Sequence, residues 1–386
     1  MDQDTARALF EKGACLVILD VPSGIEFGID LDTWETGPLF KGLKMIPPGI
    51  HYVHYSSVNS DKQAGMRSGF FHNFTSGEVV VRRWCAETED LFPGDNVSAQ
   101  DVERIKLHIR DLDKGLGAYP LSNTGGDSSY VRWQRLTGYI SPDMLSMLLP
   151  PNGEFSSATG SVYEDDELER AQRMLRRKLP QAMPDASSMP ATDSIDRFKF
   201  ARIDIKHSFP SGASAEVIRK YSEDKSWLLR RLLSTIWNNL PAGLLGEMQL
   251  GFLVIFVGQN FAGLEHWKLL LHLVLGSAEA LEDPGLVSDL YVPALRVLMV
   301  QLRECPREFV TSILEQDNFV ASVLGSLVLN IHECPSAKSR ETLEPEVDRL
   351  REFLATRFSW SLPSGAEMQD MADAEEGEYA PQVVEL

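Results

Sequence analysis

The sequence predicts an α+β protein of several domains: a β-rich, sandwich-like N-terminal domain with a few short helices, then an all-α C-terminal domain. Short β-branched and aromatic runs separated by Pro and Gly fill the first 150 residues, whereas helical periodicity fills residues 214–360. The length of 386 residues is that of two or three domains. We place the β-rich domain at 1–150 plus 197–206, a mobile linker or insertion at 151–196, the helical domain at 211–360 and an acidic tail at 361–386.

The strands of the N-terminal domain are predicted from compact apolar or alternating runs. After a short helix at 5–11, the first two strands cover residues 14–20 and 26–30. Pro47-Pro48-Gly49 predicts a rigid turn between strands at 43–46 and 50–55, because Pro fixes φ and Gly tolerates a positive φ. A hairpin is expected next, with strands at 69–74 and 79–84 joined through residues 75–78.

Three short helices are predicted after these strands. Ser98 is a suitable N-cap for a helix that presents Val102, Ile105 and Ile109 on one face and ends before Gly115. Two further helices are expected at 130–136 and 141–149, and the second begins with a Ser-Pro start signal.

The stretch from 150 to 196 breaks this pattern. It is rich in Pro, Ser, Asp and Met, so we expect a linker that folding can do without, from about 152 to 194. Ser161 precedes an acidic run that starts at Glu164, which makes it a possible site for an acidophilic kinase. Residues 197–205 alternate strongly and predict one more strand that returns to the first sheet, so the domain boundary is expected near 207–213.

Everything from 214 to 360 is predicted to be helical, with short connections that make neighbouring helices antiparallel. The helix over 244–260 is apolar almost all round, which is typical of the centre of a bundle. Pro293 falls inside a predicted helix, so either a kink or two shorter helices are expected there. The predicted helices cover residues 214–238, 244–260, 263–281, 286–303, 306–316, 318–332 and 342–357.

Charge and cysteine usage exclude several classes of protein. Lys and Arg number 37 against 56 Asp and Glu, a net charge of −19, so direct nucleic-acid binding is not expected. The four cysteines are scattered without a CxxC pair, which indicates a reducing compartment and no structural zinc. The start of the chain lacks the marks of a secretory signal, and the apolar stretch at 250–257 is far shorter than a membrane span. We therefore expect a soluble, intracellular protein without a membrane partner.

No motif for nucleotide binding, zinc proteolysis, serine hydrolysis or protein phosphorylation occurs. His51 and His54 are three apart on a predicted strand and point to opposite faces, so they are expected to be structural or solvated and not to share a metal ion. Glu265 and His266 are adjacent on a helix, where neighbours do not face each other, and His272 follows. His266 is expected at a polar edge and Trp267 as a packed ring. Cys305 and Cys334 are expected to be buried small hydrophobic residues. The sequence therefore predicts no catalytic, cofactor-binding or metal-binding residues.

The tail is the most acidic part of the chain, with seven acidic and no basic side chains in residues 361–386. It ends in a β-prone patch. One interpretation is a frayed terminus, and the other is a strand that adds to the edge of a partner's sheet. The partner-binding strand would consist of Pro381, Gln382, Val383, Val384, Glu385 and Leu386.

Several longer stretches are distinctive in combination. They are Gly24–Asp30 (GIEFGID), Lys44–His51 (KMIPPGIH), Leu245–Gln249 (LGEMQ), Glu265–Lys268 (EHWK), Gln316–Phe319 (QDNF) and Val383–Leu386 (VVEL). On these residues the chain resembles the Aar-two family, the A-one-cistron splicing factor, which assembles the U-five small nuclear ribonucleoprotein. The resemblance covers nearly the full length except residues 150–196.

The resemblance implies a helical domain similar to the VHS superhelix and a role without catalysis. It also implies the partners: Prp-eight, the large U-five scaffold protein, held at its RNase H-like and Jab/MPN domains, and other U-five proteins. A helicase would be kept off the same surface until maturation. We expect a protein that is monomeric when free and present in cytoplasm and nucleus. The alternatives are a VHS-like peptide-binding adaptor and an enzyme with an unrecognised site near His51, His54 and His72.

Overall fold

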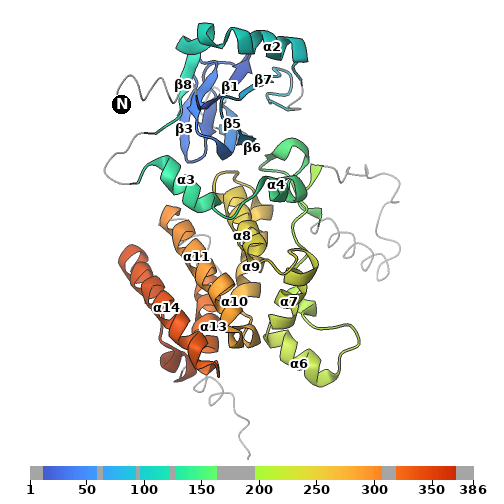
Figure 1. The fold of residues 1–386 in the computed structure, drawn as a ribbon, viewed down its shortest axis with the longest axis vertical. Helices are drawn as coiled ribbons and strands as arrows, with labels where there is room; N and C mark the ends of the chain where they lie inside the picture. Colours follow the sequence, from blue (N-terminus) through green and yellow to red (C-terminus); the bar gives the residue numbers. More distant parts are fainter. Residues whose placement is uncertain are drawn as a thin grey trace, which may run out of the picture. The chain divides into compact units, whose positions relative to one another are not determined.

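The chain folds into two units, and each unit is formed by two separate stretches of the sequence (Figure 1). The computed structural model describes residues 12–58, 64–92, 96–121, 127–162, 196–306 and 319–370. The β unit comprises Met1–Phe200 together with Leu253–Leu264, and the helical unit comprises Ala201–Phe252 together with Glu265–Leu386. The predicted class, a β domain with a few short helices followed by an all-helical region, is confirmed. The helix predicted at 5–11 and almost all of the one predicted at 306–316 lie outside the described residues.

The β unit contains two sheets that enclose a common core. One sheet has the order β7-β1-β4-β8, with β7 Val79–Arg83, β1 Ala14–Leu19, β4 Gly42–Ile46 and β8 Leu116–Ala118. The other has the order β3-β2-β5-β6-β9, with β3 Asp32–Glu35, β2 Glu26–Ile29, β5 Gly49–Val58, β6 Ala64–Phe74 and β9 Glu154–Ser156. Inward-facing residues of both sheets pack together, among them Leu16, Phe27, Leu43, Val53 and Phe70. This arrangement is a sandwich.

The predicted hairpin is wrong, although both of its strands exist. β6 pairs with β5, whereas β7 pairs in parallel with β1, from Cys15 opposite Val79 to Leu19 opposite Arg83. The turn at 75–78 therefore carries the chain from one sheet to the other, and the Thr75 N–H donates to the Glu78 carboxylate within it. The turn at Pro47-Pro48-Gly49 does the same between β4 and β5. Alternation and turn residues reveal strands and corners, but they do not reveal which strands pair.

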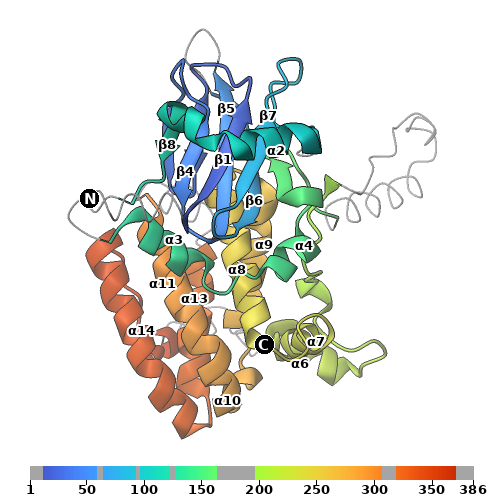
Figure 2. The same cartoon turned by 45° about the horizontal axis from the view of Figure 1, so that its top comes forward.

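Short helices cover the outer face of the four-stranded sheet (Figure 2). The predicted helix after Ser98 is present as α2, Ala99–Leu107, and the Ser98 side chain caps it by accepting from the Asp101 N–H. A 3-10 helix, Ile109–Gly115, continues it, and both pack apolar side chains over Val17 and Val81. The other two predicted helices are α3, Ser129–Thr137, and α4, Pro142–Leu148.

Residues 151–162 belong to the β unit and not to a mobile linker, which corrects the predicted range 151–196. β9 pairs with β6, and Phe155 within it is buried and stacks on Tyr52 with ring centroids 5.3 Å apart. Ser161 forms a bridge with Phe198. The remainder of the predicted linker, 163–195, lies outside the described residues.

The strand predicted at 197–205 is also wrong. Only Phe198 forms a bridge, and residues 205–207 form a 3-10 helix. Burial accounts for the pattern instead: Phe198, Ala201 and Ile203 are buried, whereas Lys199 and Arg202 beside them are exposed. The Ala201 N–H donates to the Glu247 carboxylate at 2.7 Å, within the helical unit. The units therefore divide after Phe200 and not near 207–213.

The loop between two long helices is part of the β unit. α8 is Pro241–Phe256 and α9 is Phe261–Leu275. In the loop between these helices, the Val257 carbonyl accepts a hydrogen bond from Arg67 at 3.1 Å. Asn260 donates to the carbonyls of Ser156 at 2.8 Å and Thr159 at 2.7 Å. We therefore expect a fragment that ends near residue 210 to lack part of the β unit.

The helical unit contains α6 Ala215–Glu223, α7 Ser226–Thr235, most of α8 and α9, α10 Pro284–Leu286, α11 Val292–Glu304, α13 Phe319–Glu333 and α14 Ala337–Phe358. The single helix predicted at 214–238 is two helices. Asp224 breaks it, since its backbone is extended and its carboxylate accepts from the Ser226 N–H at 2.8 Å. α8 is buried around its circumference, as its apolar sequence predicts.

The segment around Pro293 explains how a proline fits this stack. The helix continues from α10 into α11 through one wider π turn, Val287–Tyr291. A π turn re-spaces the backbone before a residue that has no N–H to donate. Pro284–Glu304 is also the one run in the described residues that is long and apolar enough by composition to cross a membrane. Half of its most apolar window is buried in the fold, and its Arg296 bonds to Glu346 of α14, as in a core helix.

Candidate functional site

The predicted partner-binding strand, Pro381–Leu386, lies outside the described residues, so it stays a prediction. The start of the predicted tail is described. Leu362 is buried, and residues 365–370 are helical behind a capping box in which Ser364 and Glu367 bond each other's backbone N–H. Met368 lies against Gly325 of α13. The acidic tail therefore begins as an ordered extension of the helical unit.

Ser161, the possible phosphosite, is buried, with 6% of its surface exposed. It bridges Phe198, and the Phe198 N–H donates to the Gly160 carbonyl at 3.1 Å beside it. A kinase needs an extended, accessible segment, so modification here requires local opening of this bridge. The acidic residues that start at Glu164 lie outside the described residues.

His51 is a structural residue of the sandwich core. Its Nδ1 lies 2.6 Å from Asp30 Oδ2, and its Nε2 lies 2.8 Å from the Pro47 carbonyl. Both ring nitrogens therefore face oxygen atoms, a carboxylate on one side and a backbone carbonyl on the other. Tyr119 also donates to Asp30 Oδ2, at 2.6 Å. No ring nitrogen of His51 remains to act as a base.

His54 faces the opposite side of the same strand, as predicted. Its ring stacks on Tyr52 with centroids 5.7 Å apart and fills the space over Gly28, where a Cβ would lie 2.3 Å from His54 Cε1. Burial, with a smaller effect of Arg67, lowers the pKa of His54 to about 3, so the ring is neutral. Its Nδ1 has no hydrogen-bond partner among the described residues. His72 is half-buried and pairs with Glu78.

The side chains of the adjacent residues Glu265 and His266 point in different directions, as helical spacing predicts. Glu265 is exposed and pairs with Lys268 at 3.5 Å, whereas His266 Nε2 lies 2.9 Å from the buried Glu247 carboxylate. In the next position, the Trp267 ring nitrogen donates to the Gln301 side chain at 3.0 Å. The stretches LGEMQ and EHWK thus meet in the core of the helical unit.

Cys305 and Cys334 are buried, as predicted. Burial raises the pKa of the Cys305 thiol to about 12, which keeps it protonated and unreactive at neutral pH. Among the residues that the structure describes, no group of three His, Cys, Asp or Glu side chains could hold a metal ion.

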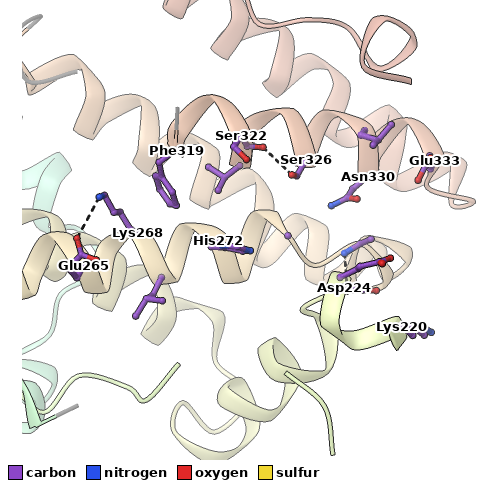
Figure 3. A pocket seen from close by; sticks show the side chains of 16 residues that line it. Lys220, Asp224, Glu265, Lys268, His272, Phe319, Ser322, Ser326, Asn330 and Glu333 are labelled. Carbon is purple, nitrogen blue, oxygen red and sulfur yellow. Dashed lines mark hydrogen bonds and ion pairs between the residues drawn. The ribbon is translucent and has the colours of Figure 1, made fainter. Parts of the chain in front are cut away.

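A groove of about 780 Å³ in the helical unit runs between α9 and α13 (Figure 3). The two helices run in the same direction. Lys268 Nζ lies 5.8 Å from the ring of Phe319 near the start of α13, and Asn330 donates to the Leu275 carbonyl at 3.2 Å near the end of α9. The turn between α6 and α7 closes the groove where α9 stops, and Figure 3 shows Asp224 there.

The groove combines apolar side chains with small ones. Phe319, Leu269 and Leu329 line it and are half-buried. Ser322 and Ser326, one turn apart on α13, are exposed, and Ser326 donates back to the Ser322 carbonyl. Such a lining offers apolar contact without bulk, so another chain can approach the helix backbones closely.

Charges divide the groove into two ends. Glu265 and Lys268 pair at one end, whereas three carboxylates, Glu223, Asp224 and Glu333, line the other, which we term the acidic end. Lys220 also lines the acidic end, but it pairs with Glu279.

The carboxylates of the acidic end differ in how they are used. Asp224 accepts from the N–H groups of Ala278 at 3.1 Å and Glu279 at 3.0 Å. Glu223 and Glu333 are exposed and form no ion pair with any residue that the structure describes. Burial and Lys225 lower the pKa of His272, so this groove residue adds no positive charge at neutral pH. The acidic end therefore carries a net negative charge.

This groove was not predicted from the sequence. Its residues come from helices that are far apart along the chain, with α9 ending at Leu275 and α13 beginning at Phe319, and helical periodicity does not say which helices become neighbours. The sequence of α13 held one signal. Phe319 and Leu329 widen its apolar face beyond the side that packs into the core, which indicates a second apolar contact.

Two family models match this chain. A model of the AAR2 N-terminal domain matches residues 12–150, and a model of the AAR2 C-terminal repeat region matches residues 200–363. The first range covers strands β1 to β8 and helices α2 to α4, and the second covers the described helices from α6 to α14.

Curated relatives align with the chain over its length. The human protein AAR2 homolog is 33% identical, and the alignment covers 100% of this chain and 97% of the relative. The mouse homolog is 32% identical with the same coverage. The Caenorhabditis elegans homolog is 31% identical over 92% of this chain and 96% of the relative. The resemblance to the Aar-two family is thereby confirmed: the chain belongs to the AAR2 family.

Proposed function

We propose that this protein is a non-catalytic spliceosome assembly factor. It binds the U-five scaffold protein Prp-eight, at the RNase H-like and Jab/MPN domains, while the small nuclear ribonucleoprotein is assembled in cytoplasm and nucleus. The observation that carries the proposal is membership of the AAR2 family over both units of the chain.

The mechanism is steric and electrostatic. Prp-eight must expose basic surfaces that later bind RNA, and a chain of net charge −19 complements such surfaces. While bound, the factor excludes RNA and the helicase from the surfaces that it covers. Release then exposes them in the mature particle.

The buried histidines support a role without catalysis. His51 has both ring nitrogens bonded, His54 is enclosed by its sheet, and His266 is committed to Glu247. A general base must reach its substrate, and each of these rings is at least 95% buried. The three therefore serve the fold.

The tail would add a strand to the client. Pro381 lacks an N–H, so pairing would begin at Gln382, and Val383 and Val384 would offer side chains to opposite faces. We expect deletion of residues 380–386 to weaken binding without changing the melting temperature. Unchanged affinity would leave the folded units as the whole interface.

The deciding experiment mixes the purified protein with the purified RNase H-like and Jab/MPN domains and measures complex formation by size-exclusion chromatography with light scattering. A one-to-one complex from two monomers is expected, and its affinity should fall as salt rises. The complex should also block binding of the helicase. Absence of binding at low salt would overturn the proposal.

The alternative of a VHS-like adaptor is favoured only by the presence of a groove between helices. An adaptor for acidic peptides needs a basic groove, whereas this one has an acidic end. Purification from a cell extract separates the two ideas: U-five proteins should accompany the assembly factor, and membrane cargo would accompany an adaptor.

A further inference from the structure

The shape of the α9–α13 groove fits a helix. On the α9 side it extends from Glu265 to Gly276, which at 1.5 Å per residue is about 17 Å or three helical turns. Two parallel helices with Ser322, Ser326 and Gly276 between them leave room for a third helix to approach closely. Phe319, Leu269 and Leu329 would receive apolar side chains at the i, i+3, i+4 and i+7 positions of that helix.

The charge of the groove sets what lies at each end of the occupant. α9 and α13 point the same way, so both of their C-termini, with partial negative charge, lie at the acidic end. Glu223 and Glu333 add two full charges without an ion-pair partner among the described residues. Lys220 offsets little of this, because Glu279 holds it. A cationic side chain is therefore strongly favoured at this end.

We propose that the groove between α9 and α13 binds an amphipathic helix of the client, about three turns long, with Lys or Arg at the end that meets Glu223 and Glu333. This inference rests on the proposed function and names the surface and the chemistry through which the helical unit would hold its client. The basic character required of the occupant is that of an RNA-binding protein, whereas the tail of this chain, with seven acidic and no basic side chains in residues 361–386, is repelled.

Site-specific photo-cross-linking tests the occupant directly. Ser326 in the full chain is replaced by p-benzoylphenylalanine, and the protein is irradiated with the purified RNase H-like and Jab/MPN domains of Prp-eight. Ser288 provides a matched control: it too is exposed and donates to the carbonyl four residues earlier, but it lies outside the groove. We expect a cross-link from position 326 to a Lys- or Arg-containing helix of one client domain, and none from position 288.

Charge reversal tests the acidic end. We expect Glu223→Arg with Glu333→Arg to weaken client binding about tenfold or more and to flatten its salt dependence. Glu344→Arg on α14, also exposed, is the control and should leave the affinity unchanged. Because all three positions are exposed, the melting temperatures should agree within experimental error.

The outcomes separate this inference from the proposed function. If the wild type binds a client domain but both the cross-link and the effect of charge reversal are missing, the groove assignment fails while the function stands. A cross-link from position 326 to this chain, for example to its own basic run at 170–178, also overturns the assignment. If the wild type binds neither client domain, both proposals fall.

Discussion

Each unit buries a histidine against a carboxylate, and the two pairs differ in how fully the carboxylate is bonded. In the β unit, Asp30 Oδ2 accepts from His51 and Tyr119, both at 2.6 Å, and Oδ1 accepts from the Tyr52 N–H at 2.9 Å. Both oxygens are thus used, and the bonds join β2 to β5 and to the residue that follows β8.

In the helical unit, one carboxylate oxygen does all the bonding. Glu247 Oε1 accepts from the Ala201 N–H at 2.7 Å and lies 2.9 Å from His266 Nε2. Its Oε2 is buried without a hydrogen-bond partner among the described residues. The pair holds the segment that enters the helical unit against α8 and α9.

The difference shows that burial alone does not measure what a polar group contributes to stability. Both pairs look like the acid–histidine couples of active sites, yet both are ties between distant segments. The stabilisation from each pair depends on how many hydrogen bonds the carboxylate accepts, because each unpaired buried atom retains its desolvation cost.

The largest effect is expected from Asp30→Ala. It removes the partner of three buried groups, the His51 ring, the Tyr119 hydroxyl and the Tyr52 N–H, which should lower the free energy of unfolding by about 3–5 kcal/mol. Urea unfolding followed by circular dichroism measures this loss. A larger loss of unfolding free energy for Glu247→Ala, which removes fewer hydrogen bonds, would contradict this ranking.

A third buried histidine, His54, has no carboxylate partner, and its contribution to the free energy of unfolding should depend on pH. Its pKa in the folded state is about 3, against 6.5 for an ordinary histidine. Between these values the unfolded chain binds a proton that the folded chain does not, so stability falls as pH falls below 6.5. The loss from this group is about 3 kcal/mol between pH 7 and pH 4.

His54→Gln should remove this part of the pH dependence, although the new side chain costs stability at pH 7. The measured quantity is the slope of the unfolding free energy against pH for both proteins, since other titrating groups cancel in the difference. Parallel slopes would mean that the His54 ring is protonated in the folded state.

Amide substitutions compare the two carboxylates atom for atom. In Asp30→Asn an NH₂ replaces either the oxygen shared by His51 and Tyr119 or the oxygen bonded to the Tyr52 N–H, so a loss of about 2 kcal/mol is expected. Asn accepts the positive φ of 56° at this position, so the backbone adds no further cost. In Glu247→Gln the NH₂ can occupy the unbonded Oε2 position, and the loss should stay below about 1 kcal/mol. Equal losses in thermal unfolding would refute the argument from bonding.

The smallest effect is expected at the half-exposed pair of His72 and Glu78, whose nitrogen and oxygen are 3.0 Å apart. Water screens this pair, so His72→Ala should cost only about 0.5 kcal/mol. Glu78 is left intact in this test because it also accepts from the Thr75 N–H. A loss as large as that of Asp30→Ala would show that exposure does not rank these pairs.

Local sequence was sufficient for the elements of this fold and insufficient for their partners. Strands such as β1 and β5 and the cap of α2 follow from alternation and capping within a few residues. The pairing of β7 with β1 depends on contacts about 64 residues apart, which no local pattern encodes. The alternation at 197–205 is misleading for the same reason: side-chain burial produces it as readily as strand pairing.

Strand spacing correctly placed His51 and His54 on opposite faces, whereas the expectation that His266 lies at a polar edge is wrong, because its ring is buried against Glu247. The bonding partners of His51 and His266, Asp30 and Glu247, lie 21 and 19 residues away and could not be predicted. The groove was missed because it exists only once α9 and α13 lie side by side.

The loop at 253–264 has a consequence during synthesis of the chain. It completes the β unit, because Arg67 and Ser156 bond to it and Gly258 lies against Phe155. The ribosome must therefore add about 100 residues after β9 before that surface is covered, which takes about 5–20 s at typical rates of translation. For that interval the edge of the Phe155 ring that faces Gly258 is uncovered on the nascent chain, so a chaperone that binds aromatic surface has a defined window in which to act.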